Sequence, residues 1–241
     1  MSIFQGKRYW LVGASEGMGR ALAQALDKEG AEVILSARNA DRLAELARNL
    51  NNAQVVPIDV TDADSVKRAA TEAGRVDAVI YNAGAYDPMP TSEWNAGSAL
   101  QMTDVNYGGA LRVLGELIPE FLARGAGDIT LIGSLSGYRG LPRAIGYGAS
   151  KAAMISMAET MRMDLRGTGV TVRIVNPGFI RTRLTAKNNF RMPQIMEPEA
   201  AAGRVMHAMR SRRFRTDFPP PFSWLIRVLD YLPDWIIYRG K

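Results

Sequence analysis

The sequence predicts an α/β fold, a doubly wound parallel sheet of about seven strands with helices on both faces, in a single domain. Short apolar runs alternate with longer helical patterns, which is typical of strands joined by crossover helices. The runs are continuously apolar rather than alternating, as in strands buried on both faces. Ligands of such a sheet bind beyond the carboxyl ends of the strands, and the candidate motifs fall there.

The elements follow one another along the whole chain. Tyr9-Trp10-Leu11-Val12 is the first predicted strand, and further strands are expected at 33–35, 55–58, 78–81, 129–132, 170–175 and 210–218. Helices are expected at 17–29, 41–50, from about 61–62 onward, at 97–123 and at 147–166. No internal repeat and no low-complexity linker divides the chain.

Composition excludes several classes of protein. In 241 residues, 47% are hydrophobic and 22% charged, which excludes disordered, collagen-like and coiled-coil chains. The absence of cysteine excludes disulfides and thiolate metal sites and favours a reducing, cytoplasmic compartment. The one histidine, His207, has no clustered partner, so we expect neither an imidazole triad nor a metal site. No apolar run reaches the roughly 18 residues of a membrane span, and the N-terminus lacks the apolar stretch of a signal peptide.

The net charge of +6 lies mostly near the C-terminus. Residues 201–241 hold eight Lys or Arg against three Asp or Glu, whereas residues 1–200 hold 22 against 21. A nucleic-acid-binding protein has a basic face throughout, so no nucleic-acid partner is expected. The basic C-terminal segment is suited to an acidic surface.

A glycine-rich turn joins the first predicted strand to the first predicted helix, with the spacing G-x-x-x-G-x-G. One glycine allows a tight turn, a second lets the backbone approach a pyrophosphate, and a third lets the helix pack on the strand. The N–H groups of the helix N-terminus then attract phosphate. An ordinary strand–helix turn is the alternative, but the position after the first strand favours a dinucleotide site. Its expected cofactor-binding residues are Gly13, Ser15, Glu16, Gly17, Met18 and Gly19.

The end of the second predicted strand indicates which dinucleotide is bound. No carboxylate lies between Val33 and Ala40, where one would accept a hydrogen bond from a ribose 2′-hydroxyl and repel a 2′-phosphate. Arg38 instead offers a planar guanidinium suited to phosphate. The sequence therefore predicts NADP(H), and the alternative is a surface arginine that caps the next helix.

Four polar residues form a candidate catalytic set. Tyr147 and Lys151 are four residues apart on a predicted helix and so share one face. Ser134 comes just past the fifth predicted strand, with Ser136 as a rival, and Asn106 lies within the preceding helical stretch. The structural alternatives are a packing role for Asn106 and an ordinary strand-end hydroxyl at Ser134.

These motifs, in this order and from residue 8 to about 182, resemble those of the short-chain dehydrogenase/reductase family. The matching elements are Gly13-(x)3-Gly17-x-Gly19, Asp59-Val60, Asn82-Ala83-Gly84, Asn106, Ser134, Tyr147-(x)3-Lys151 and Asn176-Pro177-Gly178. Val12 departs from the pattern, since the family usually has threonine there. The resemblance implies a Rossmann-type fold, with residues 1–218 as the dinucleotide-binding and catalytic domain and 183–200 as a substrate lid.

The resemblance also implies an NADP(H)-dependent oxidoreductase that reduces a ketone or aldehyde of a hydrophobic small molecule, or catalyses the reverse reaction. Tyr147 would be the general acid/base, with its pKa lowered by Lys151, and Ser134 would hold the substrate oxygen. Asn106 would bend its helix and hold a water linked to the lysine. Further cofactor contacts would come from Asp59, Val60, Asn82, Ala83, Gly84, Tyr147, Lys151, Pro177, Gly178, Ile180 and Thr182.

Each of these assignments has an alternative. Asp59 could instead cap the next helix, a role that Thr61 or Asp62 could equally supply, and Pro177-Gly178 could form a plain turn. A non-catalytic NADP(H)-binding regulatory protein on the same fold, or a nucleotide-sugar epimerase, are alternatives to the reductase.

Residues 219–241 form an amphipathic tail that departs from the family pattern. Its apolar residues at helical spacing are Phe222, Leu225, Ile226, Leu229 and Leu232, with Trp224, Val228, Tyr231, Trp235, Ile236, Ile237 and Tyr238 beside or after them. Basic charge beside Trp and Tyr, as at Arg239 and Lys241, is typical of a segment lying on a membrane surface. A terminal helix docked on the same chain or on a neighbouring subunit has the same composition. Both interpretations stay open, and the resemblance implies a homo-oligomer, either a dimer or a tetramer.

Overall fold

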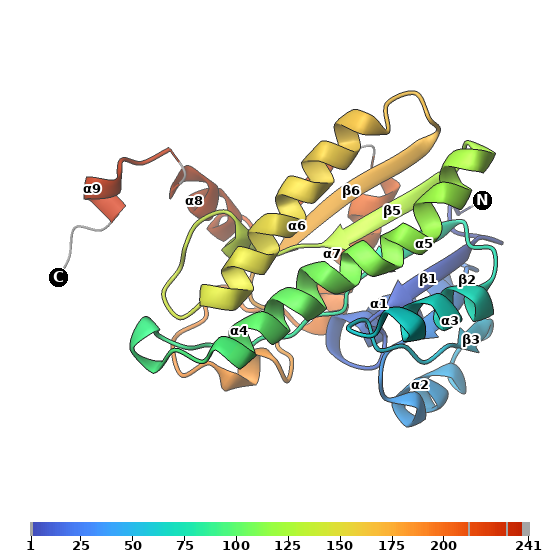
Figure 1. Ribbon diagram of the computed structural model, residues 1–241, viewed down its shortest axis with the longest axis horizontal. Coiled ribbons are helices and arrows are strands. Elements are labelled where there is room, and N and C mark those ends of the chain that lie inside the picture. Colours follow the sequence, from blue (N-terminus) through green and yellow to red (C-terminus); the bar gives the residue numbers. More distant parts are fainter. Residues whose placement is uncertain (1, 212, 230, 238–241) are drawn as a thin grey trace.

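The computed structural model describes residues 2–211, 213–229 and 231–237. Within them, one parallel sheet has the strand order β3-β2-β1-β4-β5-β6-β7 (Figure 1). Its strands are β1 (Arg8–Val12), β2 (Glu32–Ser36), β3 (Ala53–Val55), β4 (Ala78–Tyr81), β5 (Gly127–Ile132), β6 (Val170–Pro177) and β7 (Arg215–Phe218). The predicted doubly wound α/β fold is confirmed. Because the strand order reverses between β1 and β4, a crevice is expected at the carboxyl ends of these two strands.

Helices cover both faces of the sheet (Figure 1). The apolar core on one face includes side chains of α1 (Gly17–Lys28), α2 (Ala40–Ala47) and α7 (Pro198–Arg210). The core on the other face includes α3 (Ala63–Ala73), α5 (Gly109–Arg124) and α6 (Ile145–Asp164). α4 (Ala96–Thr103) packs against α6, and the short helices α8 (Phe222–Leu229) and α9 (Asp234–Ile237) follow the last strand.

The central strands are buried because their side chains are apolar on both sides. All four residues of β4 are buried, as are Tyr9 to Val12 of β1. One buried polar chain joins β1, β2 and the residue after β3: the Trp10 indole donates to the Ser36 hydroxyl at 2.8 Å, and Ser36 donates to the Val56 carbonyl at 2.6 Å. These buried groups are hydrogen-bonded and so avoid the cost of an unpaired donor in the core.

Three expected boundaries differ from the structure. The strand expected at 55–58 is β3 at Ala53–Val55, although Val56 and Ile58 still donate to the carbonyls of Leu35 and Ala37 beyond its end. The helix expected at 97–123 is interrupted by a π-helical turn, η2 (Asp104–Gly108). The last strand begins at Arg215 because α7 continues to Arg210.

The two C-terminal regions that the sequence singled out have distinct structures. Residues 198–200 of the expected lid form the first turn of α7, in which Pro198 occupies the position that needs no N–H partner. In the tail, Tyr238, Arg239 and Lys241 lie outside the described residues. None of the helices in the described part of the chain is long and apolar enough to cross a membrane.

Candidate active site

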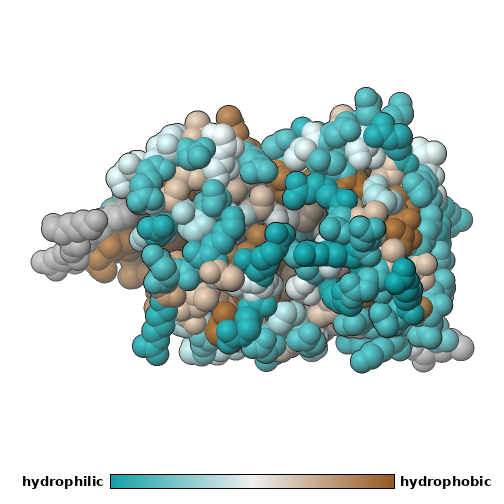
Figure 2. Space-filling model, turned by 90° about the horizontal axis from the view of Figure 1, so that it is seen from below, coloured by the Kyte–Doolittle hydropathy of each residue, from teal (hydrophilic) through white to brown (hydrophobic). Residues whose placement is uncertain are grey.

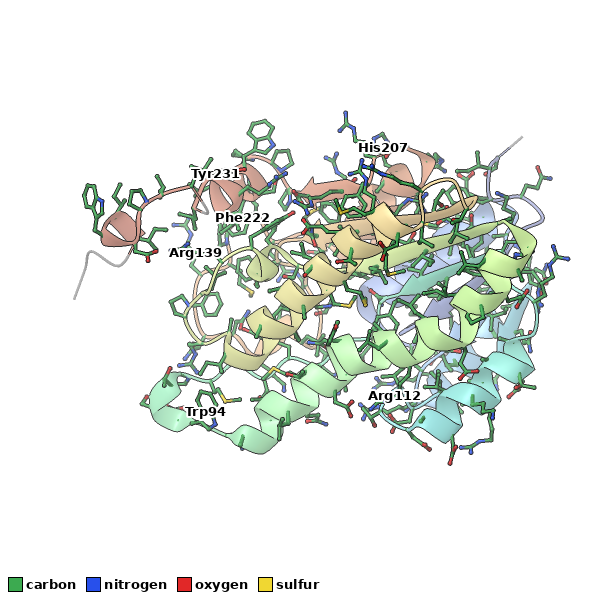
Figure 3. All side chains as sticks on the ribbon, turned by 45° about the horizontal axis from the view of Figure 1, so that its top comes forward. Trp94, Arg112, Arg139, His207, Phe222 and Tyr231 are labelled. Atoms are coloured by element: carbon green, nitrogen blue, oxygen red, sulfur yellow. The ribbon has the colours of Figure 1, made fainter. Side chains whose placement is uncertain are left out.

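A pocket of about 740 Å³ opens at the carboxyl ends of the central strands. Nearly all the residues singled out from the sequence line it, although they come from loops far apart along the chain. The exceptions are Gly19 and Asn106, which are not part of the pocket lining. His207, in contrast, is exposed on α7, well apart from the pocket residue Phe222 (Figure 3). The topology therefore brings the predicted set together and leaves the lone histidine outside.

The glycine turn is pressed against the end of β4. Gly13 has a φ of +96°, and a Cβ added to it would lie 2.5 Å from the backbone nitrogen of Ala83. The Asn82 side chain holds the turn by donating to the Gly13 carbonyl at 2.7 Å. Glu16, the residue before α1, makes no side-chain cap, and the first turn of α1 contains no acidic residue. The α1 N-terminus therefore directs uncapped N–H groups at the pocket, as an anion site requires.

Arg38 lines the pocket from the end of β2, where its side chain is exposed. The helix that follows is capped by Asn39, whose side chain accepts from the Arg42 N–H at 2.9 Å. The capping role considered for Arg38 thus belongs to its neighbour. Arg42 is a pocket residue that the sequence reasoning missed, although its spacing of four from Arg38 could have indicated it.

Asp59 also lines the pocket, and its carboxylate accepts hydrogen bonds from the Thr61 N–H at 2.9 Å and the Thr61 hydroxyl at 2.7 Å. These two bonds hold the pKa of Asp59 below its ordinary value. The cap of α3 is Asp62, which accepts from the Asp64 N–H. Asp59 is therefore a charged carboxylate in the pocket wall rather than a helix cap.

Glu16 joins three parts of the pocket rim. Its carboxylate pairs with Arg42 at 2.7 Å and with Arg183, in the segment after β6, at 2.7 Å. Thr182 lies beside the glycine turn, since a Cβ on Gly17 would lie 2.9 Å from its Cγ2 atom. The segment that follows β6 is thereby fixed against the start of α1.

Ser134 and Tyr147 are hydrogen-bonded neighbours in the pocket wall. Ser134 is 6% exposed, and its Oγ accepts from the Ser136 N–H at 3.1 Å. Burial raises the pKa of Tyr147, and a hydrogen bond with Ser134 opposes that rise. Because the Ser134 oxygen is held by a backbone donor, its own proton is left for Tyr147 or for another oxygen in the pocket. Ser136, the rival in the sequence, supports Ser134 through its main chain.

Lys151 lies one turn further along α6, with 3% of its surface exposed. Its Nζ donates to the Ile132 carbonyl at 2.8 Å and lies 5.7 Å from the centroid of the Tyr147 ring. Burial lowers the pKa of Lys151 to about 8. The expected lowering of the Tyr147 pKa by Lys151 is not seen in the protein alone, where burial of the phenol dominates.

Asn106 lies in the π-helical turn between α4 and α5. Its amide donates to the Ala85 carbonyl at 3.0 Å and to the Ser150 hydroxyl at 2.9 Å, and its oxygen accepts from the Ala85 N–H at 2.7 Å. The helix has a π-helical turn at Asn106, and the side chain connects the loop after β4 to α6. Its role in holding a water stays a prediction.

Aromatic and aliphatic side chains line another part of the pocket wall, beside the polar Gln101, Thr185 and Asn188. The Tyr86 ring meets the Tyr147 ring edge-on at 4.9 Å, and its hydroxyl donates to Asn188 of the expected lid at 2.6 Å. Phe222 and Ile226 of α8 also line the pocket, and Phe222 stacks on Phe179 at 5.8 Å. The sequence reasoning placed these two residues only on an amphipathic tail.

Comparison with known proteins gives a consistent result. The profile of the family described as short chain dehydrogenase matches residues 7–192. An uncharacterized oxidoreductase of Myxococcus xanthus is 35% identical over 226 residues, which cover 90% of this chain and 88% of that protein. An uncharacterized oxidoreductase of Staphylococcus epidermidis is 33% identical, over 83% of this chain and 89% of that protein.

Two solved structures are similar along almost their whole length. A short-chain dehydrogenase from Burkholderia cenocepacia, crystallised in complex with NADP, has a TM-score of 0.87 and 26% identity, with coverage of 98% of this chain and 97% of that chain. A short-chain dehydrogenase from Streptomyces avermitilis has a TM-score of 0.83 and 26% identity, with coverage of 97% and 98%.

Proposed function

The chain belongs to the short-chain dehydrogenase/reductase family of oxidoreductases, and we propose that it uses NADP(H) to reduce a ketone or aldehyde of a hydrophobic small molecule, or to oxidise the alcohol. The observation that carries this proposal is one pocket that joins a glycine turn of the dinucleotide-binding type to Ser134, Tyr147 and Lys151. The apolar wall beside Tyr147 supports a hydrophobic substrate.

The pocket fits a dinucleotide phosphate on two observations of its own. Gly13 and Gly17 line the pocket and present backbone without side chains to it, and the α1 N-terminus is uncapped. The glycine turn would hold the pyrophosphate, Arg38 a 2′-phosphate, Asp59 the adenine side and Thr182 the nicotinamide side. When bound, the cofactor supplies a hydride to the substrate carbon or accepts one from it.

The protein's own contribution is to move one proton and stabilise charge. The Tyr147 hydroxyl gives its proton to the substrate oxygen during reduction, or takes it back during oxidation. The Ser134 hydroxyl donates a hydrogen bond where negative charge develops on that oxygen. Lys151, when protonated, stabilises the tyrosinate left behind. The aromatic side chains of Tyr86 and Phe222 exclude water from the site of this proton transfer.

Replacing Tyr147 by Phe tests the acid. The ring stays and the proton donor is lost, so kcat should fall by roughly 10²–10⁴-fold while the dissociation constant of NADPH changes little. Stopped-flow turnover and fluorescence titration with NADPH measure the two quantities. Tyr231→Phe, at an 80% exposed position, is the matched control and should keep full turnover.

Unchanged turnover in Tyr147→Phe would reject the proposed acid. If the wild-type protein binds NADPH but turns over no member of a broad panel of ketones and aldehydes, the non-catalytic regulatory alternative is favoured instead.

Arg38→Asp tests the cofactor preference. A carboxylate at this position would repel a 2′-phosphate and would accept a hydrogen bond from a ribose 2′-hydroxyl. The ratio of NADPH affinity to NADH affinity should therefore fall by about 100-fold or more. Titration of the two cofactors gives the ratio. Arg48→Asp makes the same charge change at an exposed position beyond α2 and should leave the ratio unaltered. An unaltered ratio in Arg38→Asp would reject its role.

A further inference from the structure

A largely buried carboxylate connects three segments of the pocket wall from outside the pocket. Asp217, near the end of β7, has 9% of its side chain exposed. Its Oδ1 accepts from the Tyr138 hydroxyl at 2.7 Å and from the Asn176 side-chain amide at 2.8 Å, and its Oδ2 pairs with Arg227 of α8 at 3.4 Å. None of these residues lines the pocket, but each partner of Asp217 lies in a segment that does.

Tyr138 ends the turn that carries Ser134, and we call residues 134–138 the serine turn. The Gly137 N–H donates to the Ser134 carbonyl at 3.0 Å, so the turn is closed by its own backbone. A Cβ on Gly137 would lie 2.7 Å from the Lys151 backbone, which shows that the turn packs tightly against α6. The serine turn is therefore held between Lys151 on α6 and Asp217 on β7.

The phenol of Tyr138 keeps the proton that it donates to Asp217. Burial raises the pKa of Tyr138, and the hydrogen bond with the negatively charged Asp217 raises it further. The guanidinium groups of Arg215 and Arg227 lie over the Tyr138 ring, 5.6 and 5.5 Å from its centroid. Both the hydroxyl and the ring of Tyr138 thus have fixed partners.

Asn176 connects the same carboxylate to the segment that enters the pocket after β6. Its side-chain amide donates to the Tyr138 hydroxyl at 3.0 Å as well as to Asp217, so the three polar groups form a closed triangle. The next two residues, Pro177 and Gly178, line the pocket. The end of β6 and the serine turn therefore share one anchor.

The third partner, Arg227, connects Asp217 to α8. This helix lies beyond the carboxyl ends of β5 and β6 (Figure 1), at an end of the molecule where hydrophobic side chains gather (Figure 2). Among residues 222–229, only Arg227 is charged, so its pairing with Asp217 is the ionic contact of α8 with the sheet. The same helix contributes Phe222 and Ile226 to the pocket wall.

An ion pair removed from water adds little net stability, because the desolvation of its charges offsets their attraction. Its hydrogen bonds do fix directions, and a reaction depends steeply on where its hydrogen-bond donors lie. We propose that Asp217 is a positioning residue for the reductase reaction. Through Tyr138 it holds the Ser134 hydroxyl against the substrate oxygen, and through Arg227 it holds the α8 wall against the rest of the substrate. This role rests on the proposed function, whereas the holding of the serine turn does not.

Tyr138→Phe tests the positioning of Ser134. The substitution removes the hydroxyl and keeps the ring, so kcat should fall about tenfold, while KM for the ketone and the dissociation constant of NADPH change little. In a Ser134→Ala background the same substitution should not lower kcat further, because the residue through which it acts is absent. An unchanged kcat in Tyr138→Phe, or a loss of the same size in both backgrounds, would overturn the proposal.

Arg227→Gln tests the positioning of α8. It removes the charge that pairs with Asp217, so KM for a bulky hydrophobic ketone should rise about fivefold and kcat should stay near the wild-type value. Asp217→Ala should show both changes. Asp217→Asn keeps an oxygen for Tyr138 but no charge for Arg227, and should show only the rise in KM. Asp128→Ala is the matched control, since it removes a carboxylate paired with Arg173 near the start of β5, and should alter neither constant. An Asp217→Ala variant with wild-type kcat and KM would make Asp217 a purely structural residue.

Amide hydrogen exchange tests the holding of the serine turn without any turnover. Peptides that cover 134–138 should exchange faster in Tyr138→Phe and Asp217→Ala than in the wild type, whereas Asp128→Ala should match the wild type there. Equal exchange in all four proteins would contradict the holding. A wild type that reduces no ketone, but in which exchange differs as expected, would reject the proposed function and leave Asp217 as the anchor of the turn.

Discussion

Lys151 places an amino group in the interior, where its Nζ has a hydrogen bond to the Ile132 carbonyl. Burial lowers its pKa to about 8, from an ordinary value of 10.5 that the unfolded chain would keep. Between these values the unfolded chain binds more protons than the folded one, so the free energy of unfolding rises with pH. The cost of burying Lys151 is therefore full below pH 8 and disappears above the ordinary pKa.

Lys151→Met should stabilise the fold at neutral pH while it removes catalysis. A methionine fills a similar volume without a charge to desolvate, and we expect a gain of about 1–2 kcal/mol at pH 7 that shrinks toward pH 10. Urea unfolding at the two pH values measures the gain. Lys67→Met, on the exposed side of α3, is the control and should give no such gain. A gain of equal size at both pH values would mean that the ammonium is not the source.

At the scale of elements, the glycine turn and α1 meet through contacts with no spare room. A Cβ on Gly19 would lie 1.9 Å from the Gly13 carbonyl oxygen and 2.7 Å from the Asn82 side-chain nitrogen. The nearer atom is backbone and is itself held by Asn82, so it cannot move aside easily. Both the packing of α1 and the shape of the phosphate site depend on this contact.

Gly19→Ala should therefore weaken the fold and the dinucleotide site together. The inserted methyl group displaces α1 from the turn, at a cost of about 1–3 kcal/mol, and NADPH affinity should fall in parallel. Thermal unfolding and cofactor titration measure the two effects. Gly203→Ala on α7 is the control, since a Cβ there meets nothing within 4 Å and alanine favours a helix. Normal affinity and stability in Gly19→Ala would show that the turn can relax.

The π-helical turn at Asn106 illustrates what periodicity misses. The apolar pattern predicts one helix over 97–123, and the pattern itself contains no sign of the wider turn at Asp104–Gly108. The irregular turn is accompanied by a tertiary contact, in which Asn106 bonds Ala85 after β4 and Ser150 on α6. Helical pattern is local information, whereas these partners are 21 and 44 residues away.

For the whole molecule, the sequence is most informative where topology and local pattern agree. Continuous apolar runs predict a parallel sheet, and a parallel sheet brings all its carboxyl-end loops to one edge. This is why Gly13, Arg38, Ser134 and Tyr147 could be expected in one pocket before their distances were known. The position of α8 could not be derived this way, because it depends on Phe222 of α8 meeting Phe179 in the loop after β6, a contact that no periodic pattern encodes.

The two sides of α8 give the last prediction. Phe222 lines the pocket and Trp224 is 67% exposed, so the same helix should respond differently to two aromatic deletions. Phe222→Ala should lower kcat/KM for a bulky hydrophobic ketone by about tenfold, because a pocket contact is lost, and should change that for a small ketone far less. Trp224→Ala should leave both values unaltered, because Trp224 is not among the residues that line the pocket. Equal losses of kcat/KM in the two variants would mean that the whole helix α8 stabilises the pocket. Phe222 would then not itself contact the substrate.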